Sequence, residues 1–94
     1  MNTKEYLISC LIEELAEVQK ELVKCLRFTP DHVSPHDQRS NIARAGLEYA
    51  DAIAIIEMLE AEGVVIPISP ERIVEKKERT KKLMFTSRKL GALK

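Results

Sequence analysis

The sequence predicts an all-α fold in which three helices per chain form a bundle that oligomerisation completes. Apolar residues recur at three- and four-residue intervals over two long stretches, and turn-forming residues separate the stretches from each other and from a third, basic segment. The chain has 94 residues, 45% of them hydrophobic, which predicts one folded domain spanning residues 1–94. Domains of this size bury only about 60 to 65% of their chain surface, so we expect a second subunit to cover the remaining apolar faces.

The first helix is expected over residues 3–26. Its apolar residues fall on one packing face: Leu7, Ile8, Leu11, Ile12, Leu15, Val18, Leu22, Val23 and Leu26. On a helical wheel Glu14, Glu17 and Glu21 lie together beside this face, and Glu13 lies further round. These acids therefore flank the core instead of opposing it.

The second helix is expected over residues 41–62, after a Pro-containing loop that covers residues 28–40. Ser40 is a suitable N-cap for it. Apolar side chains cover nearly every face of this helix, which is typical of a central helix surrounded by others. Glu48 and Asp51 share one side of it and point toward a neighbouring helix.

The third helix is expected over residues 70–85, after Gly63 and an extended connector at residues 64–68. Ser69, Pro70 and Glu71 supply a capping hydroxyl, a proline at the first helical position and an acid in the first turn. Most of this helix is basic. The remaining residues, 86–94, are expected to form a mobile basic tail.

Charge and cysteine content exclude several classes of protein. Fifteen basic and fifteen acidic residues cancel, which argues against general electrostatic attraction to nucleic acid. Cys10 and Cys25 lie in one expected helix, roughly 22 Å apart, too far for a disulfide bond. No apolar run reaches membrane-spanning length and no signal peptide is evident, so we expect a cytoplasmic protein with no membrane partner.

Glu48 and Asp51 are the most informative pair in the sequence. An unpaired carboxylate in an apolar interior costs several kcal/mol or more, so both acids require a cation, a proton or a basic partner. Carboxylates three residues apart on a helix project together, and a neighbouring helix that carries Glu14 and Glu17 would complete a set of oxygen ligands. Mg²⁺ or Mn²⁺ suits such a set, and Mg²⁺ commonly completes its shell with substrate phosphates. This pattern predicts a metal-dependent enzyme acting on a di- or triphosphate.

The order Glu13-Glu14-x-x-Glu17 and then Glu48-x-x-Asp51 resembles the paired EExxE and ExxD motifs of the MazG-type all-α nucleoside triphosphate pyrophosphohydrolases. The resemblance runs from Glu13 through the third helix, in which Lys76-x-x-Arg79 looks like the basic pair that often follows the ExxD helix in this family. It implies Mg²⁺-dependent cleavage of a nucleoside triphosphate between the α and β phosphorus atoms. It also implies a homodimer or homotetramer.

The resemblance also implies residue roles. Two residues would neutralise the substrate phosphates, Lys76 and Arg79, and Glu13 would act as an outer acid or assist the attacking water. The implied metal ligands are Glu14, Glu17, Glu48 and Asp51. Two features depart from the family pattern: the segment between the two acidic motifs is at or slightly beyond its usual length, and only four aromatic residues are present to stack on a base.

Other interpretations stay open at this level. The acids of the first helix would also suit a solvated face that pairs with Lys20 and Lys24, and Glu48 and Asp51 would also suit pairing with Arg44 or with the third helix. The alternative function is therefore a non-catalytic helical oligomer or partner-binding protein. Among enzymes, a relative that hydrolyses phosphoribosyl-ATP is a further alternative. The sequence does not specify the base, the sugar or the number of metal ions. His32 and His36 lie in a Pro-containing loop and are weak candidates for metal ligands.

Overall fold

The protein consists of three helices and no strand. The computed structural model describes residues 1–94, with α1 at Thr3–Phe28, α2 at Asn41–Ala61 and α3 at Pro70–Lys89. The all-α prediction is confirmed. The third helix is longer than expected, because residues 86–89, assigned to the tail, continue its hydrogen bonding up to a cap at Leu90, whose N–H donates to the Thr86 carbonyl at 3.0 Å.

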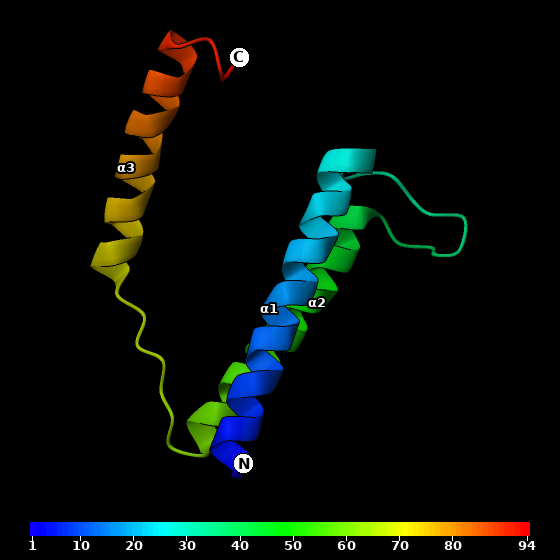
Figure 1. Ribbon diagram of the computed structural model, residues 1–94, viewed down its shortest axis with the longest axis vertical. Helices are drawn as coiled ribbons and strands as arrows, with labels where there is room; N and C mark the ends of the chain where they lie inside the picture. The colour runs from blue at the N-terminus through cyan, green and yellow to red at the C-terminus, as the bar shows by residue number, and fades with distance from the viewer.

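The first two helices form an antiparallel hairpin, and they lie side by side along most of their length (Figure 1). Its small core is made by Leu7 and Leu11 from α1 with Ala52 and Leu59 from α2. Three partly buried residues pack against this core: Ile55, Ile56 and Val64. The hairpin is therefore the only part of the chain with an interior of its own.

Both helices face each other through positions that alternate in steps of four and three residues. These positions are buried or half-buried: Leu7, Leu11, Glu14, Val18 and Glu21 in α1, and Asn41, Ala45, Glu48, Ala52, Ile55 and Leu59 in α2. Such spacing keeps one stripe of each helix directed at its partner. Glu14, Glu21 and Glu48 thus occupy interior positions of the hairpin, where hydrophobic residues would be usual.

Side chains cap the helices at their N-termini as the sequence predicts. Ser40 Oγ accepts a hydrogen bond from the Ala43 N–H at 3.2 Å, and Ser69 Oγ accepts one from the Arg72 N–H at 3.1 Å. These bonds satisfy backbone donors that have no partner within the helix. At the end of α2, Gly63 has φ 83°, a left-handed conformation that glycine adopts without steric cost.

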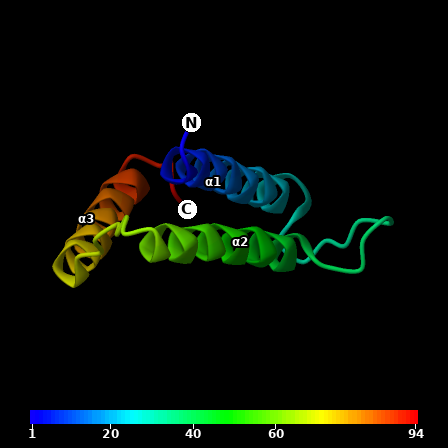
Figure 2. The same ribbon diagram turned by 90° about the horizontal axis from the view of Figure 1, so that it is seen from below.

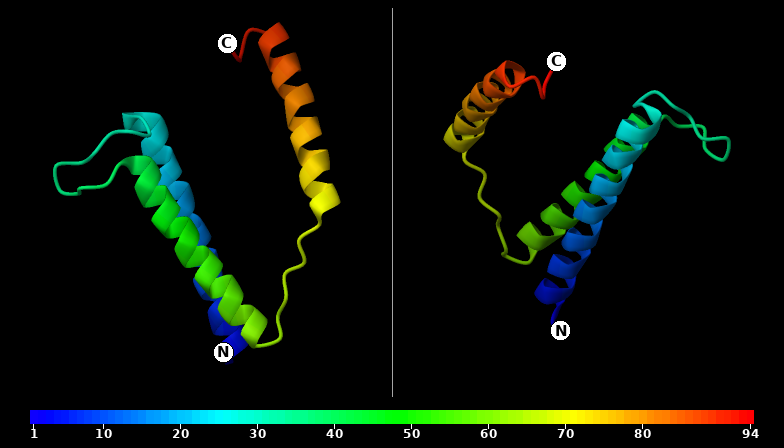
Figure 3. Two further views of the ribbon diagram at one scale, coloured as in Figure 1. Left: turned by 180° about the vertical axis from the view of Figure 1, so that it is seen from behind. Right: turned by 45° about the horizontal axis from the view of Figure 1, so that its top comes forward.

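The segment between α1 and α2 is an ordered loop that projects to one side at the end of the hairpin (Figure 3). Asn41 holds its two ends together: its side-chain amide donates to the Thr29 carbonyl at 2.9 Å and its backbone N–H donates to the His32 carbonyl at 3.0 Å. The Ile42 N–H adds a bond to the Pro30 carbonyl at 3.0 Å. These contacts explain why Asn41 is buried although it is polar.

The third helix lies apart from the hairpin at the end of the extended connector formed by residues 64–69 (Figure 1), and the view from below shows it inclined to both hairpin helices (Figure 2). It makes no contact with α1 or α2, and all of its residues except Ser87 are exposed. Within the chain, the predicted bundle is therefore a two-helix hairpin with a separate third helix. None of the three helices has the length and apolar character needed to cross a membrane.

Candidate metal centre

Three carboxylates from two helices converge on the hairpin. Glu14 of α1 and Glu48 and Asp51 of α2 each place one oxygen so that the three atoms lie within 4.8 Å of one another. Glu14 and Glu48 reach this point because they occupy interior positions of their helices. Asp51 follows Glu48 by three residues and projects from the same side of α2. We call these three residues the acidic cluster.

The acidic cluster is electrostatically unfavourable on its own. Partial burial raises the pKa of Glu14 above its ordinary value of 4.5, and the negative charges of Asp51 and Glu48 raise it further. Glu17 and Glu13 add smaller effects in the same direction. A group surrounded by like charges favours a bound proton or a nearby cation. The arrangement therefore favours the binding of a positive ion.

The other acids expected at this site lie near it without joining it. Glu17 is half-buried and close enough to affect the pKa of Glu14, but its oxygens are not among the three that converge. Glu13 is exposed. Lys76 and Arg79 belong to α3, so this arrangement of the chain does not bring them to the acids.

Sequence reasoning missed a second ionic group, centred on Glu21. This carboxylate is 2% exposed; Lys24 Nζ lies 3.2 Å from its Oε1, and Arg44 Nε lies 3.7 Å from its Oε2. The other side of the Arg44 guanidinium donates to Asp37 of the loop. Arg44 therefore pairs with Glu21 and Asp37, and not with Glu48 or Asp51 as one interpretation of the sequence had it. Glu21 follows Glu14 by seven residues and so lies on the same interior face of α1. This spacing is the sequence signal that could have identified it.

Arg44 and Asp37 reinforce each other's charge. The hydrogen bond from Arg44 lowers the pKa of Asp37 below its ordinary value of 3.8, and backbone N–H donors of the loop lower it further against the opposing effect of burial. The same hydrogen bond raises the pKa of Arg44. This pair fastens the loop to α2 at one end of the hairpin.

The acidic cluster does not line either of the two cavities in the chain. One cavity lies at the loop end of the hairpin, between Lys24 and Arg44, and the other lies beside the connector and the start of α3. The cluster is instead an open site on the side of the hairpin, with Asp51 exposed. The cluster is therefore open to solvent on the side of Asp51.

The donor set of the acidic cluster fits a hard divalent cation. Carboxylate oxygens are the ligands that Mg²⁺ and Mn²⁺ prefer, and no sulfur or imidazole group is part of the cluster. Comparisons of the chain with models of known protein families, with curated proteins and with solved structures found no match. The functional argument therefore depends on the geometry of the residues themselves.

Proposed function

We propose that the protein is a Mg²⁺-dependent nucleoside triphosphate pyrophosphohydrolase that yields a nucleoside monophosphate and pyrophosphate, with Mn²⁺ as a possible substitute. The observation that carries this proposal is the convergence of Glu14, Glu48 and Asp51 from two helices within 4.8 Å. It supports the resemblance of the two acidic motifs to the MazG-type family. Because nucleotide pools are cytoplasmic, we also expect the protein to act in that compartment.

In this proposal the acidic cluster holds the metal ion. Glu17, on the next turn of α1, adds a further ligand or orients the three carboxylates. A divalent ion at such a site neutralises phosphate charge and lowers the pKa of a bound water toward neutrality. Glu13 is exposed beside the cluster, where its carboxylate can accept a proton from the attacking water or orient it. No covalent intermediate with the protein is needed.

The proposed phosphate-binding role of Lys76 and Arg79 requires α3 to lie against the acidic cluster, in the same chain or in a neighbouring one. Charge supports this placement. The third helix contains eight basic and three acidic residues, whereas α2 contains one basic and four acidic residues. Opposite charge on two elements favours their association and its orientation.

A substrate panel with single carboxylate variants tests the proposal. Pyrophosphate release would be measured with canonical and modified nucleoside triphosphates, and with phosphoribosyl-ATP, in the presence of Mg²⁺. We expect Glu48→Gln and Asp51→Asn each to lower kcat/KM more than about tenfold, a loss of about 1.4 kcal/mol of transition-state stabilisation, because each removes a metal ligand. Folding should be unchanged or more stable, since one repelling charge is lost.

Glu57→Gln is the matched control. Glu57 is an exposed acid on the same helix and lies outside the acidic cluster, so its loss changes net charge equally without removing a ligand. Activity of this variant should stay close to that of the wild type. Retention of more than about a tenth of the activity by Glu48→Gln and Asp51→Asn would contradict metal ligation by these residues.

A non-catalytic helical oligomer is the second candidate function. It is favoured by the many exposed apolar side chains on all three helices, among them Leu26 at 87%, Ile12 at 64% and Leu83 at 63% exposure. Thermal melts separate the two functions. Binding of Mg²⁺ at a hundred times its Kd stabilises a folded site by about 2.7 kcal/mol, whereas helices that only associate with one another gain no such increment.

A further inference from the structure

The cavity at the loop end of the hairpin is lined almost entirely by polar and charged residues. Its volume is about 410 Å³, which lies within the range of small-molecule sites. Only one lining residue is hydrophobic. The lining residues come from the end of α1, the loop and the start of α2: Lys24, Phe28, His32, Ser34, His36, Asp37, Arg39, Asn41 and Arg44.

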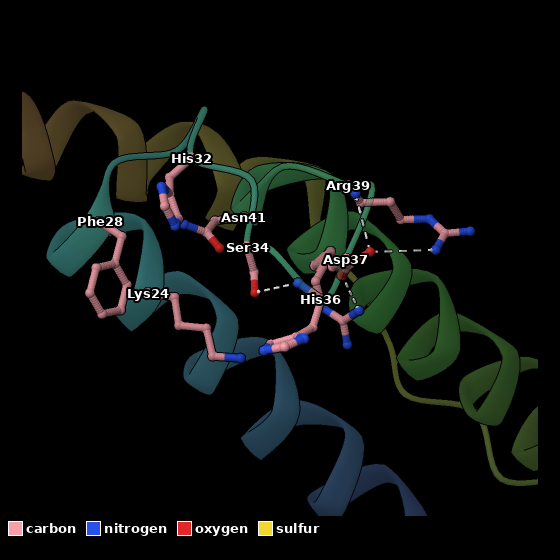
Figure 4. Close-up of a pocket in the computed structure, with 9 residues that line it drawn as sticks. Lys24, Phe28, His32, Ser34, His36, Asp37, Arg39 and Asn41 are labelled. Atoms are coloured by element: carbon pink, nitrogen blue, oxygen red, sulfur yellow. Dashed lines mark hydrogen bonds and ion pairs between the residues drawn. The ribbon is translucent and has the colours of Figure 1, made fainter.

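Five of the nine lining side chains carry nitrogen groups that can donate hydrogen bonds to an anion. Lys24, Arg39 and Arg44 are cations, and His32 and His36 are imidazoles with a ring N–H. In Figure 4 the side chains of Lys24 and His36, from different elements, point toward one another. A cation that faces a second hydrogen-bond donor favours an anion between them.

Two carboxylates partly balance these cations. Asp37 lines the cavity and is held by Arg44 and, at 4.0 Å, by Arg39; Glu21 lies beneath it and contacts Lys24 and Arg44. The three cations and two carboxylates leave a local charge of +1. A multivalent anion is consequently favoured over a neutral ligand.

The cavity is formed in advance of any ligand. The loop is fastened at its base by the hydrogen bonds of Asn41 to Thr29 and His32, and within its tip by the Asp37 N–H, which donates to the Ser34 carbonyl at 3.1 Å. Glu21, 2% exposed and with its Oε2 lacking a hydrogen bond, holds Lys24 and Arg44 from below. A site assembled in this way loses little conformational entropy when it binds a ligand.

We propose that this loop-end pocket binds a phosphate group, either inorganic phosphate or the phosphate of an organic monoester, with Lys24, Arg44 and His36 as its donors. This site is separate from the acidic cluster and requires no metal ion. It goes beyond the proposed hydrolase function, because it would bind its ligand in a protein without that activity.

Titration of the intact protein with sulfate, followed through backbone amide NMR shifts in the absence of divalent metal, tests the pocket directly. Sulfate carries two charges and has the tetrahedral shape of a phosphate group. We expect saturable shifts in the loop and at the adjoining helix ends, with a Kd on the order of 1 mM.

Lys24→Gln and His36→Gln are the test variants, and Arg27→Gln is the control. Arg27 is an exposed cation of α1 outside the pocket, so its variant matches the charge change of Lys24→Gln. Lys24→Gln should weaken sulfate binding about tenfold, as expected for a charge-assisted hydrogen bond, and Arg27→Gln less than about twofold. His36→Gln keeps the Glu21 pair intact and should also weaken sulfate binding, because one donor of the pocket is lost.

Competition then identifies the source of the phosphate group. Displacement of sulfate by inorganic phosphate alone assigns the pocket to the free ion, and stronger displacement by a nucleoside monophosphate assigns it to an organic ester. Absence of saturable binding, or equal weakening by Arg27→Gln and by both pocket variants, would overturn the proposal. The result is independent of hydrolysis, because Glu48→Gln should leave sulfate binding unchanged.

Discussion

Glu14 shows how a single residue links the fold to the proposed chemistry. Its position in the four-and-three spacing of α1 directs it at α2, where an apolar residue would add to the core. Instead it meets Glu48 and Asp51, and its pKa rises through partial burial and their charges. Glu14 therefore stabilises the metal-free fold less than an apolar residue would, and it concentrates negative charge beside Glu48 and Asp51. Such an arrangement is typical of functional positions.

The raised pKa of Glu14 predicts how the metal-free protein responds to pH. The folded state binds the Glu14 proton more tightly than the unfolded state, so this contribution to stability is complete below the unfolded value, near 4.5, and is lost as the pH rises through the higher folded value. In EDTA, urea unfolding should therefore show less stability at pH 7 than just above pH 4.5. Asp37 titrates below this window, because its pKa is lowered from 3.8.

Substitution isolates the contribution of Glu14 to that pH dependence. Glu14→Gln should raise the stability of the metal-free protein at neutral pH and flatten its dependence on pH, whereas Glu13→Gln, an exposed neighbour, should change neither markedly. Added Mg²⁺ should stabilise the wild type and have less effect on Glu14→Gln. A wild-type protein whose stability only increases from pH 4.5 to neutrality would contradict this account.

The sequence predicted that Glu14, Glu48 and Asp51 lie together, but it also placed Glu17 among them and did not predict the group around Glu21. Glu48 and Asp51 were conspicuous because their helix is otherwise apolar, and the spacing of Glu14 placed it at the edge of the packing face. Glu21 looked similar on a helical wheel, yet its surroundings depend on where the loop returns. Only the fold shows that Asn41 closes the loop and brings Arg44 over Glu21.

At the scale of elements, the two hairpin helices owe their pairing to few residues. Leu7, Leu11, Ala52 and Leu59 form the whole buried cluster, so each contributes a large share of the hairpin's stability. The starts of the three helices followed from caps and spacing, which are local properties of the sequence, whereas α1 and α3 continue to Phe28 and Lys89, beyond their expected ends. The isolation of α3 could not be predicted, because its few apolar residues indicate a packing face without identifying what covers it.

Leu59→Ala tests the importance of this small core. Leu59 is 1% exposed, so truncation should lower the free energy of unfolding by about 2 to 5 kcal/mol through lost burial and a residual cavity. Leu90→Ala is the control, since Leu90 is 79% exposed and lies outside the three helices. The two variants would be compared by urea unfolding at a fixed protein concentration. Equal losses would show that the isolated hairpin is not the packing unit in solution.

At the scale of the whole molecule, the single chain exposes more surface than a folded monomer of its size. Its accessible area is 7699 Å², whereas a compact monomer of this mass exposes about 5,500 Å². Its radius of gyration is 17.2 Å, against about 12 Å for a compact domain of this length. The difference in area matches what one protomer buries in an obligate dimer, about 1,000 to 2,500 Å².

We therefore predict that the protein is a homo-oligomer in which α3 packs against another copy. Leu83→Glu should weaken assembly, because Leu83 is 63% exposed on a helix that has no partner within its own chain, and a charge in an apolar interface is costly. Lys82→Glu changes the adjacent residue to the same acid and should have a smaller effect. The oligomeric state of both variants would be measured by sedimentation equilibrium.

If assembly also brings Lys76 and Arg79 to the acidic cluster, Leu83→Glu should lower hydrolysis in proportion to the loss of oligomer. Activity should then recover at higher protein concentration. A wild-type chain that sediments as a monomer at all concentrations, with full activity, would contradict both the predicted assembly and the role of α3 in the site.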